Sequence, residues 1–414
     1  MRISIIIPAW NLWNYTAACL NSLAATTPPG AAQVIVVDNG STDETATSLT
    51  SLGKKLFGDS FSAVRLEENR GFAIGCNAGA AAATTDLLFF LNNDTTATPG
   101  WLEPLVAACE NPSTGGAGPL LLYPDQTIQH CGIFFDPLLR VGHLYEGFPA
   151  DHPLPAKKRR LQAITGAALA TRKTLFDRIG GFCEEYRNGY EDIDLCCHFT
   201  ALGFQLQIVP ESVFYHHTSR TPGRFASERN NSALAAKRLG GIIRPDLHKF
   251  AHADGYELKL WDCGLFRLEL PEGARRAELE SSSETAEALA ASLHKEPLWR
   301  NGWQRLINAY ARHGKPGNAI GTAAQALKFF PDQALIRDAL KLSQGDTQKA
   351  DISDLARIAR EFGPLSGEQA KYIGSKLQKT RKTAADEKDK LLCSHIDAWL
   401  DQLRHLQADQ GISK

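Results

Sequence analysis

A chain of 414 residues is too long for a single compact core, so two or three domains are expected. The formal net charge of -1 excludes general nucleic-acid binding, and 43% hydrophobic with 22% charged residues excludes a disordered chain. The nine cysteines are scattered and form no CxxC pair, which indicates reduced thiols rather than a disulfide framework or a zinc site.

Residues 1 to about 115 alternate predicted strands and helices. The opening run ISIIIPA is too short for a signal peptide and is stopped by a proline, so it predicts a buried strand. Further strands are predicted in AQVIVVDN, FSAVRLEEN and DLLFFLNND, with helices between them. Continuous apolar strands separated by helices favour a parallel sheet that is covered on both faces.

Polar residues follow three of these strands, at Asp38, Asn69 and Asp94. Because parallel strands end at one edge, these loops should lie together where open α/β sheets bind ligands. Asp94 could hold magnesium or manganese, which usually takes one or two carboxylates plus substrate phosphates. Each loop taken singly is explained as well by an ordinary turn, since Asn and Asp favour turns.

Residues 116 to about 245 are expected to form a second wall facing these loops. The segment GYEDIDLCCHFTALGF predicts a helix that begins with Glu191 and Asp192, and a helix N-terminus stabilises negative charge. Either carboxylate is then available as a base or a hydrogen-bond acceptor. A strand in QLQIVPESVFYHHTS is followed by His216 and His217, and either imidazole could complete a metal site. Helix capping and a solvent-exposed histidine pair are the simpler explanations of each motif alone.

The last part of the chain has a different character. YELKLWDCGLFRLELPEG alternates apolar and polar residues, which predicts a small hairpin within a connector at residues 251–283. Residues 284–414 are expected to be helical. One stretch there has the spacing of a tetratricopeptide repeat, at Trp303, Leu306, Tyr310, Ala319, Ala326 and Pro331. A plain helical bundle is an equal alternative, and ALIRDALKLSQGDTQKA is a degenerate candidate for a second repeat.

No apolar run in the sequence approaches the roughly 18 residues that a membrane span requires. We therefore expect a cytoplasmic protein, or one that is peripheral at the inner face of the membrane.

Seven motifs in one order carry a family resemblance: SIIIPAWN, VIVVDNGSTD, NRGFAIGCNAG, LLFFLNNDT, ITGAALATRKTLFDRIGGF, YEDIDLCCHFTALGF and VPESVFYHHTS. Across roughly residues 1 to 220 the chain resembles the family 2 glycosyltransferases, particularly their rhamnosyltransferase-like branch. The resemblance implies an α/β GT-A fold over residues 1–250, a nucleotide-sugar donor, a divalent cation and inversion at the anomeric carbon.

The resemblance also implies roles for individual residues. Asp192 matches the catalytic base, with Glu191 beside it. Asp94 matches the residue that binds the metal, manganese or magnesium, and His216 matches a histidine that helps bind the metal or the diphosphate. The donor nucleotide would be bound by Pro8, Asp38, Asn69, Arg70, Gly71, Asn77, Asn92 and Asn93.

Three positions depart from the family pattern. Asn92 replaces the first acid of the common Asp-x-Asp motif, Cys183 stands where relatives have Asp, and His198 stands where relatives often have Arg. The last two changes concern acceptor recognition more than donor binding.

Several alternatives stay open. A nucleotidyltransferase would carry a glycine-rich loop after the first strand, and IPAWNLWNY contains no glycine. A non-catalytic scaffold, or a nucleotide-sugar-binding protein, could act through its helical repeat domain. The same helices could instead recruit a protein partner to an enzyme. The donor is expected to be of the UDP or dTDP type, and the acceptor a glycan, a lipid-linked glycan or a protein.

Overall fold

The computed structural model describes residues 2–217, 227–281, 285–332, 334, 335, 341 and 362–409. The chain divides into two compact units. Unit 1 comprises Met1–Phe134 and Gly142–Arg244, and unit 2 comprises Phe135–Val141 and Pro245–Lys414.

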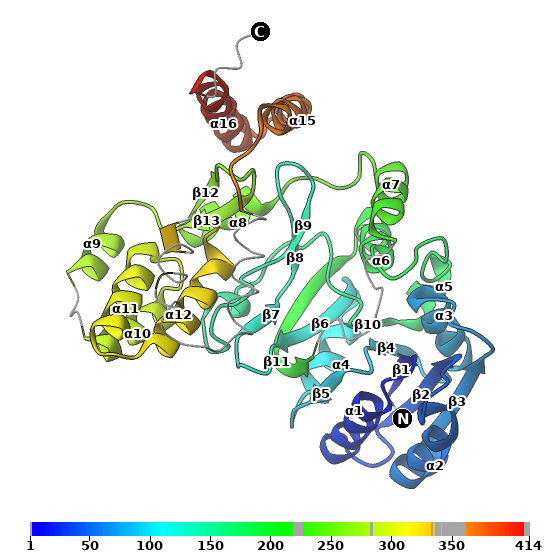
Figure 1. The fold of residues 1–414 in the computed structure, drawn as a ribbon. Helices are drawn as coiled ribbons and strands as arrows, with labels where there is room; N and C mark the ends of the chain where they lie inside the picture. Colours follow the sequence, from blue (N-terminus) through cyan, green and yellow to red (C-terminus); the bar gives the residue numbers. More distant parts are fainter. Residues whose placement is uncertain are drawn as a thin grey trace. The chain divides into compact units, whose positions relative to one another are not determined.

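A nine-stranded sheet forms the centre of the described part of unit 1 (Figure 1). Its strands follow the order β3-β2-β1-β4-β10-β6-β11-β5, and β7 pairs with β6. The bounds of the strands are β1 Ile3–Ala9, β2 Ala32–Asn39, β3 Phe61–Leu66, β4 Leu87–Leu91, β5 Thr95–Ala97, β6 Thr114–Leu122, β7 Ile128–His130, β10 Ala168–Arg172 and β11 Gln205–His216.

The first four strands by sequence, β1 to β4, are mutually parallel, as the apolar runs predict. The rest of the sheet is mixed, because β10 runs antiparallel to both β4 and β6. Strands β2, β3 and β4, which carry or precede Asp38, Asn69 and Asp94, therefore end at one edge of the sheet. This parallel block delivers those loops to a common place, as expected from the sequence.

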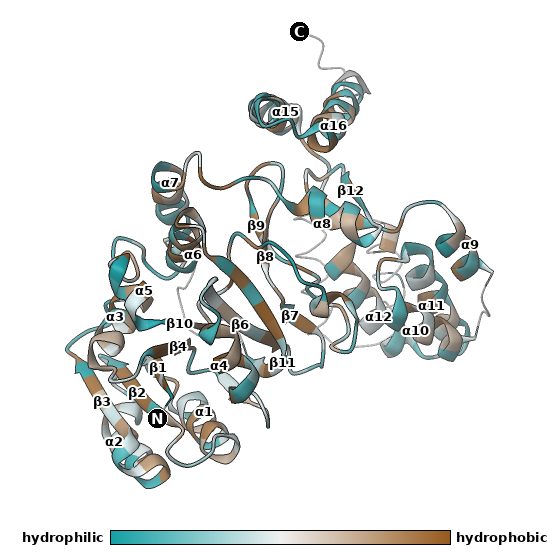
Figure 2. Cartoon of the chain, turned by 180° about the vertical axis from the view of Figure 1, so that it is seen from behind, coloured by the Kyte–Doolittle hydropathy of each residue, from teal (hydrophilic) through white to brown (hydrophobic). Residues whose placement is uncertain are grey.

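Helices cover both faces of the sheet. Their bounds in unit 1 are α1 Trp13–Thr26, α2 Thr45–Phe57, α3 Phe72–Ala82, α4 Leu102–Glu110, α5 Lys173–Arg178, α6 Glu191–Ala201 and α7 Glu228–Arg238, with short 3-10 turns at Gly58–Ser60 and Leu154–Ala156. One continuous core joins α1, α2 and α4 to the face of β1 that carries Ile3, Ile5 and Ile7. Strands such as β1 and β4 are brown in Figure 2 because nearly every residue in them is apolar and buried. The expectation of a sheet covered on both faces is confirmed.

Small residues let α3 lie directly on the sheet. A Cβ atom added at Gly79 would come within 2.4 Å of Ile6 and 3.1 Å of Val37, whereas one added at Gly75 would come no closer than 3.3 Å, to Pro8. The close approach places the start of α3, and the loop before it, beside the ends of β1 and β2.

We expect Gly79→Ala to destabilise unit 1 by about 1–3 kcal/mol, because the added methyl group must displace backbone or core side chains. This sign is opposite to the helix preference of alanine, which favours Ala over Gly by roughly 1 kcal/mol. Chemical denaturation of both variants measures the effect, with Gly75→Ala as the matched control in the same helix. A Gly79→Ala protein as stable as Gly75→Ala would contradict the packing described here.

The second segment of unit 2, from Pro245 onward, begins with a short helix and a hairpin. The hairpin of β12 (Glu257–Leu260) and β13 (Phe266–Glu269) is antiparallel, which confirms the sequence prediction. The helices described in unit 2 are α8 Leu247–Asp254, α9 Ala274–Glu280, α10 Ala286–Lys295, α11 Arg300–Arg312, α12 Pro316–Phe329, α15 Gly367–Asp386 and α16 Lys390–Asp409. Strands β8 (Ile133–Phe135) and β9 (Val141–His143) form a separate two-stranded sheet.

The stretch with tetratricopeptide spacing folds as the helix pair α11 and α12. Trp303, Leu306, Ala319 and Ala326 are all buried on this pair, while Tyr310 is half-buried. Burial of these positions is what the repeat pattern requires, and the repeat itself stays a prediction. The degenerate second candidate lies mostly outside the described residues.

Across the described ranges, none of the helices combines the length and the apolar character needed to cross a membrane.

Candidate active site

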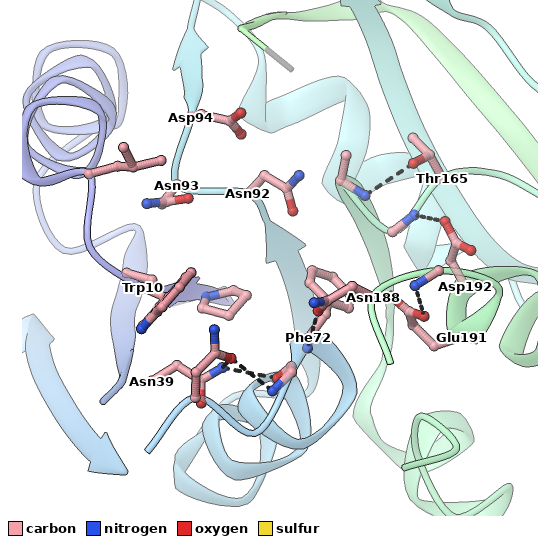
Figure 3. A pocket seen from close by; sticks show the side chains of 18 residues that line it. Trp10, Asn39, Phe72, Asn92, Asn93, Asp94, Thr165, Asn188, Glu191 and Asp192 are labelled. Atoms are coloured by element: carbon pink, nitrogen blue, oxygen red, sulfur yellow. Dashed lines mark hydrogen bonds between the residues drawn. The ribbon is translucent and has the colours of Figure 1, made fainter. Parts of the chain in front are cut away.

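A cavity opens at the carboxyl ends of the parallel strands in unit 1 (Figure 3). Its walls come from six separate parts of the sequence. The lining residues are Pro8, Ala9, Trp10, Leu12, Asn39, Asn69, Gly71, Phe72, Asn92, Asn93, Asp94, Thr165, Gly166, Ala167, Asn188, Gly189, Glu191 and Asp192. Asn92, Asn93 and Asp94 stand on one wall, and Glu191 and Asp192 stand across the cavity from them.

Two backbone groups fix the carboxylate of Asp192. Gly166 N–H donates to Oδ2 at 2.8 Å, and Ile193 N–H donates to Oδ1 at 2.9 Å. Each carboxylate oxygen has a second lone pair, so Asp192 can still accept a proton from a ligand. Its place at the start of α6 also favours negative charge.

Glu191 has a different environment from its neighbour. It is only 5% exposed, and its Oε2 accepts the N–H of Gly189 at 2.6 Å. Asp192 is less buried than Glu191. Of the two acids, Asp192 is therefore the better placed to reach a bound molecule, and Glu191 shapes the loop before the helix.

Asp94 meets His216 at the opposite wall. Gln129 Nε2 donates to the backbone oxygen of His216, which leaves Gln129 Oε1 facing His216 Nδ1 at 2.6 Å. An amide oxygen only accepts, so Nδ1 must carry the proton. His216 Nε2 faces Asp94 Oδ1 at 3.1 Å and lies 3.2 Å from Asn92 Nδ2.

This pair of atoms fits a divalent cation. A carboxylate oxygen and an imidazole nitrogen that converge form a donor set that such a cation can share once the nitrogen carries no proton. Among the residues the structure describes, no group of three or more His, Cys, Asp or Glu side chains is arranged to hold a metal ion. Any cation here would need further ligands from a bound molecule, as the single carboxylate predicts.

Comparison with known proteins identifies the family. The model of the family described as Glycosyl transferase family 2 matches residues 4–132. Residues 4–132 therefore carry a glycosyl transferase family 2 domain. The α/β GT-A fold expected with that family, and the helical region that follows it, are confirmed.

Named relatives of the chain include bacterial proteins. It is 32% identical over 229 residues to the uncharacterized protein y4gI of Sinorhizobium fredii, covering 53% of this chain and 25% of that protein. It is 30% identical over 230 residues to the O-antigen biosynthesis protein RfbC of Myxococcus xanthus, covering 53% of this chain and 17% of that protein. It is also 28% identical over 217 residues to an N-acetylglucosaminyl-diphospho-decaprenol L-rhamnosyltransferase of Mycobacterium tuberculosis, covering 46% of this chain and 68% of that protein. The chain thus spans a quarter or less of the first two proteins.

The fold brings most of the predicted site residues of this glycosyltransferase unit together. Those that line the cavity are Pro8, Asn69, Gly71, Asn92, Asn93, Asp94, Glu191 and Asp192. His216 lies directly behind Asp94 and is 3% exposed. His217 instead packs its ring against Tyr15, at 5.6 Å between centroids, so His216 is the histidine that faces Asp94.

Asp38 lies outside the lining of the cavity. Its carboxylate is paired with Arg65 and accepts the N–H of Ser41 at 2.8 Å. The next residue, Asn39, lines the cavity instead, because successive side chains of a strand point to opposite sides. Asn39 Oδ1 accepts the N–H of Arg70 at 2.9 Å, and its Nδ2 donates to Gly71 O at 3.0 Å.

Two further predicted donor residues also lie outside the lining. Asn77 donates from Nδ2 to Phe182 O at 2.9 Å and accepts the N–H of Phe182 at 3.0 Å, so its side chain is committed to holding that loop. Arg70 contributes its backbone N–H to Asn39, and its side chain does not line the cavity.

Sequence reasoning missed several lining residues: Trp10, Asn39, Phe72, Thr165 and Asn188. Trp10 directly follows the first strand, so the same strand-end rule could have found it. Asn188 and Gly189 form an Asn-Gly pair just before the acids, which is a strong turn signal. Nothing in the sequence alone indicates that Thr165 faces this cavity.

His130 lies behind the wall that Thr165 forms. Its Nε2 accepts the N–H of Thr165 at 3.3 Å, and its Nδ1 lies 2.6 Å from Nδ1 of His143. Burial first, and then repulsion from His143 and His216, hold the pKa of His130 well below its usual value of 6.5. The folded protein therefore keeps His130 neutral.

This environment predicts a pH-dependent loss of stability. Below about pH 6.5 the unfolded chain binds a proton at His130 that the folded chain does not, so the free energy of unfolding falls as pH falls. We expect His130→Gln to remove up to about 1.4 kcal/mol per pH unit from that slope. Denaturation of wild type and variant between pH 7.5 and 5.5 measures it, and parallel curves for the two proteins would contradict a neutral buried His130.

Proposed function

We propose that this chain transfers a sugar, with inversion at the anomeric carbon, from a nucleoside-diphosphate sugar to a hydroxyl group. One observation carries the proposal: a single cavity is lined by Asp94 at the end of β4 and by Asp192 at the start of α6. The family match of residues 4–132 supports the reaction class. In the cavity, Asp94 is available on the side of the leaving diphosphate and Asp192 on the side of the attacking hydroxyl group.

The donor would lie along the strand ends. Its nucleotide would occupy the part of the cavity lined by Pro8, Trp10, Asn39, Asn69 and Gly71, where backbone and amide groups can hydrogen-bond a base and ribose. Its diphosphate would lie near Asp94 and His216. A divalent cation held by these two residues would neutralise the charge that develops on the departing diphosphate.

Asp192 would act as the base. It would take the proton from the acceptor hydroxyl as that oxygen attacks the anomeric carbon from the side opposite the diphosphate. One displacement of this kind inverts the configuration. No acid is needed for the leaving group, unlike in a glycosidase, because a nucleoside diphosphate leaves as a stabilised anion.

The substrates we propose follow from the relatives. An O-antigen biosynthesis protein and a rhamnosyltransferase named for a diphospho-decaprenol-linked acceptor support a glycan-type acceptor. The UDP or dTDP type of donor follows from the family resemblance of the motifs. A glycan or a lipid-linked glycan is accordingly the acceptor we favour, with a protein as the other possibility. The helices of unit 2 would recruit the acceptor or a protein partner.

A nucleotide-release assay tests the proposal. The full chain is incubated with Mn²⁺ and, in turn, dTDP-L-rhamnose, UDP-glucose and UDP-N-acetylglucosamine, and free nucleoside diphosphate is measured. We expect slow hydrolysis of at least one donor, and a rise in melting temperature with the matching nucleoside diphosphate by mass action. Release of pyrophosphate from a nucleoside triphosphate and a sugar phosphate, with no hydrolysis of any donor, would instead indicate a nucleotidyltransferase and refute the proposal.

A further inference from the structure

The acid pair follows a loop with an unusual backbone. Three successive residues before α6 have positive φ: Asn188 at 56°, Gly189 at 146° and Tyr190 at 74°. Residues other than glycine seldom adopt this region, and they keep it only where the surrounding structure over-determines it. The direction in which Asp192 enters the cavity therefore depends on whatever holds this loop.

Two of the contacts that hold the loop belong to the cavity itself. Asn188 Oδ1 accepts the N–H of Phe72, the first residue of α3, at 3.1 Å. Gly189 N–H donates to Glu191 at 2.6 Å. Figure 3 shows both contacts beside Asp192.

A third contact comes from outside the cavity. Asn231 of α7 holds the backbone of Arg187 by both of its polar atoms. Its Oδ1 accepts the Arg187 N–H at 3.2 Å, and its Nδ2 donates to the Arg187 oxygen at 2.9 Å. A Cβ atom added at Gly189 would lie 3.6 Å from Asn231 Nδ2, so the loop packs closely on this amide.

The burial of Asn231 sets it apart from its neighbour. Asn231 is 3% exposed, whereas Asn230 is exposed on the same helix. A buried amide is costly unless it is hydrogen-bonded, and Asn231 directs both of its groups to one residue of the loop. The same helix is also tied to α6, because Arg238 binds Asp194 through Nε at 2.8 Å and Nη2 at 3.1 Å.

We propose that Asn231 is a positioning residue for the reaction. It touches no substrate, but by holding Arg187 it fixes residues 188–190 in their positive-φ path and so fixes the direction of the Asp192 carboxylate. The inference rests on the proposed function, in which Asp192 is the base. We call the two hydrogen bonds between Asn231 and the backbone of Arg187 the clamp. Displacing a catalytic base by about 1 Å can lower the rate roughly 100-fold, so loss of the clamp should lower turnover without removing the donor site.

The first test needs no substrate. Hydrogen–deuterium exchange is measured on a peptic peptide spanning residues 184–193 in wild type, Asn231→Ala and the matched control Asn230→Ala. Asn231→Ala should exchange faster there, because the Arg187 N–H loses its acceptor, and Asn230→Ala should match the wild type. Equal protection in all three proteins would overturn the inference.

The second test is kinetic and uses the donor of highest turnover from the release assay. Asn231→Ala should lower kcat by about 10- to 100-fold with the donor KM within about threefold of wild type. Asn231→Asp should be intermediate, because a carboxylate can accept from the Arg187 N–H but cannot donate to its oxygen. A wild-type kcat in Asn231→Ala would overturn the inference. It would also be overturned if Asn231→Ala is partly unfolded at the assay temperature and regains wild-type kcat when cooling restores the folded protein.

Failure of this inference differs from failure of the proposed function. If the chain is not a transferase, wild type and all variants alike release no nucleoside diphosphate. If only the clamp is unimportant, wild type is active and Asn231→Ala is equally active.

Discussion

Asp192→Asn should lower kcat by about 1,000-fold while the donor KM stays within about threefold of wild type, since general base catalysis contributes roughly 100- to 10,000-fold. The substitution preserves shape, and its amide oxygen can still accept one of the two N–H groups, of Gly166 and Ile193, that now bind Asp192. The capacity to take a proton is lost, together with the other of these two hydrogen bonds. Steady-state nucleoside diphosphate release in the presence of acceptor measures the effect, and the melting temperature confirms that the variant is folded.

Asp177→Asn is the matched control for Asp192→Asn. Asp177 is an exposed carboxylate of α5 in the same unit, paired with Lys173 at 3.1 Å. This variant should keep wild-type kcat. An Asp192→Asn protein that retains more than about a tenth of wild-type kcat would remove Asp192 from the role of base.

Asp94→Asn should abolish the gain in nucleotide affinity that manganese provides. The carboxylate of Asp94 is 3.1 Å from His216 Nε2, and an amide cannot supply the negative charge that a hard divalent cation prefers. We expect the dissociation constant of the nucleoside diphosphate, measured with Mn²⁺, to rise about 10- to 100-fold. This factor is smaller than the fall in kcat expected for Asp192→Asn. Isothermal titration calorimetry with Mn²⁺ and with EDTA measures it.

Comparison of the two titrations isolates the role of the metal. In wild type, EDTA should weaken binding of the nucleoside diphosphate; in Asp94→Asn, binding with Mn²⁺ and with EDTA should be nearly equal. If Mn²⁺ improves binding by the same factor in both proteins, Asp94 does not hold the cation.

Much of the fold of unit 1 follows from local patterns in the sequence. LLFFL and ISIIIPA are apolar throughout, and the structure buries them as β4 and β1 at the centre of the sheet. Such runs predict strands because both faces of a central strand are buried, so that all of its side chains are apolar. The loops at Asn69 and Asp94 then follow from the rule that parallel strands end together.

The direction of individual side chains was harder to predict. Asp38 and Asn39 are the last two residues of β2. The motif VIVVDNGSTD led us to predict that Asp38, the acid, binds the nucleotide. The structure pairs Asp38 with Arg65 and turns Asn39 to the cavity. A one-residue difference at a strand end selects the opposite face, and the sequence does not say where that strand's last hydrogen bond falls.

Contacts between distant segments could not be predicted at all. Asn231 and Arg187, which the clamp joins, are 44 positions apart in the sequence. Asn188 and Phe72, which share a hydrogen bond, are 116 positions apart. Neither residue belongs to a repeating pattern, because each acts through one hydrogen-bonding geometry that only the folded chain creates. In unit 2, by contrast, the spacing of Trp303, Leu306, Ala319 and Ala326 was enough to indicate which face of the helix pair is buried.

The most direct test of the whole account is a crystal structure of the chain with Mn²⁺ and the donor that it hydrolyses, in the Asp192→Asn variant to slow turnover. The account predicts the nucleotide beside Trp10 and Asn39, the cation in contact with Asp94, and the anomeric carbon facing residue 192 across the cavity. A nucleotide bound elsewhere, or one whose sugar points away from residue 192, would contradict it.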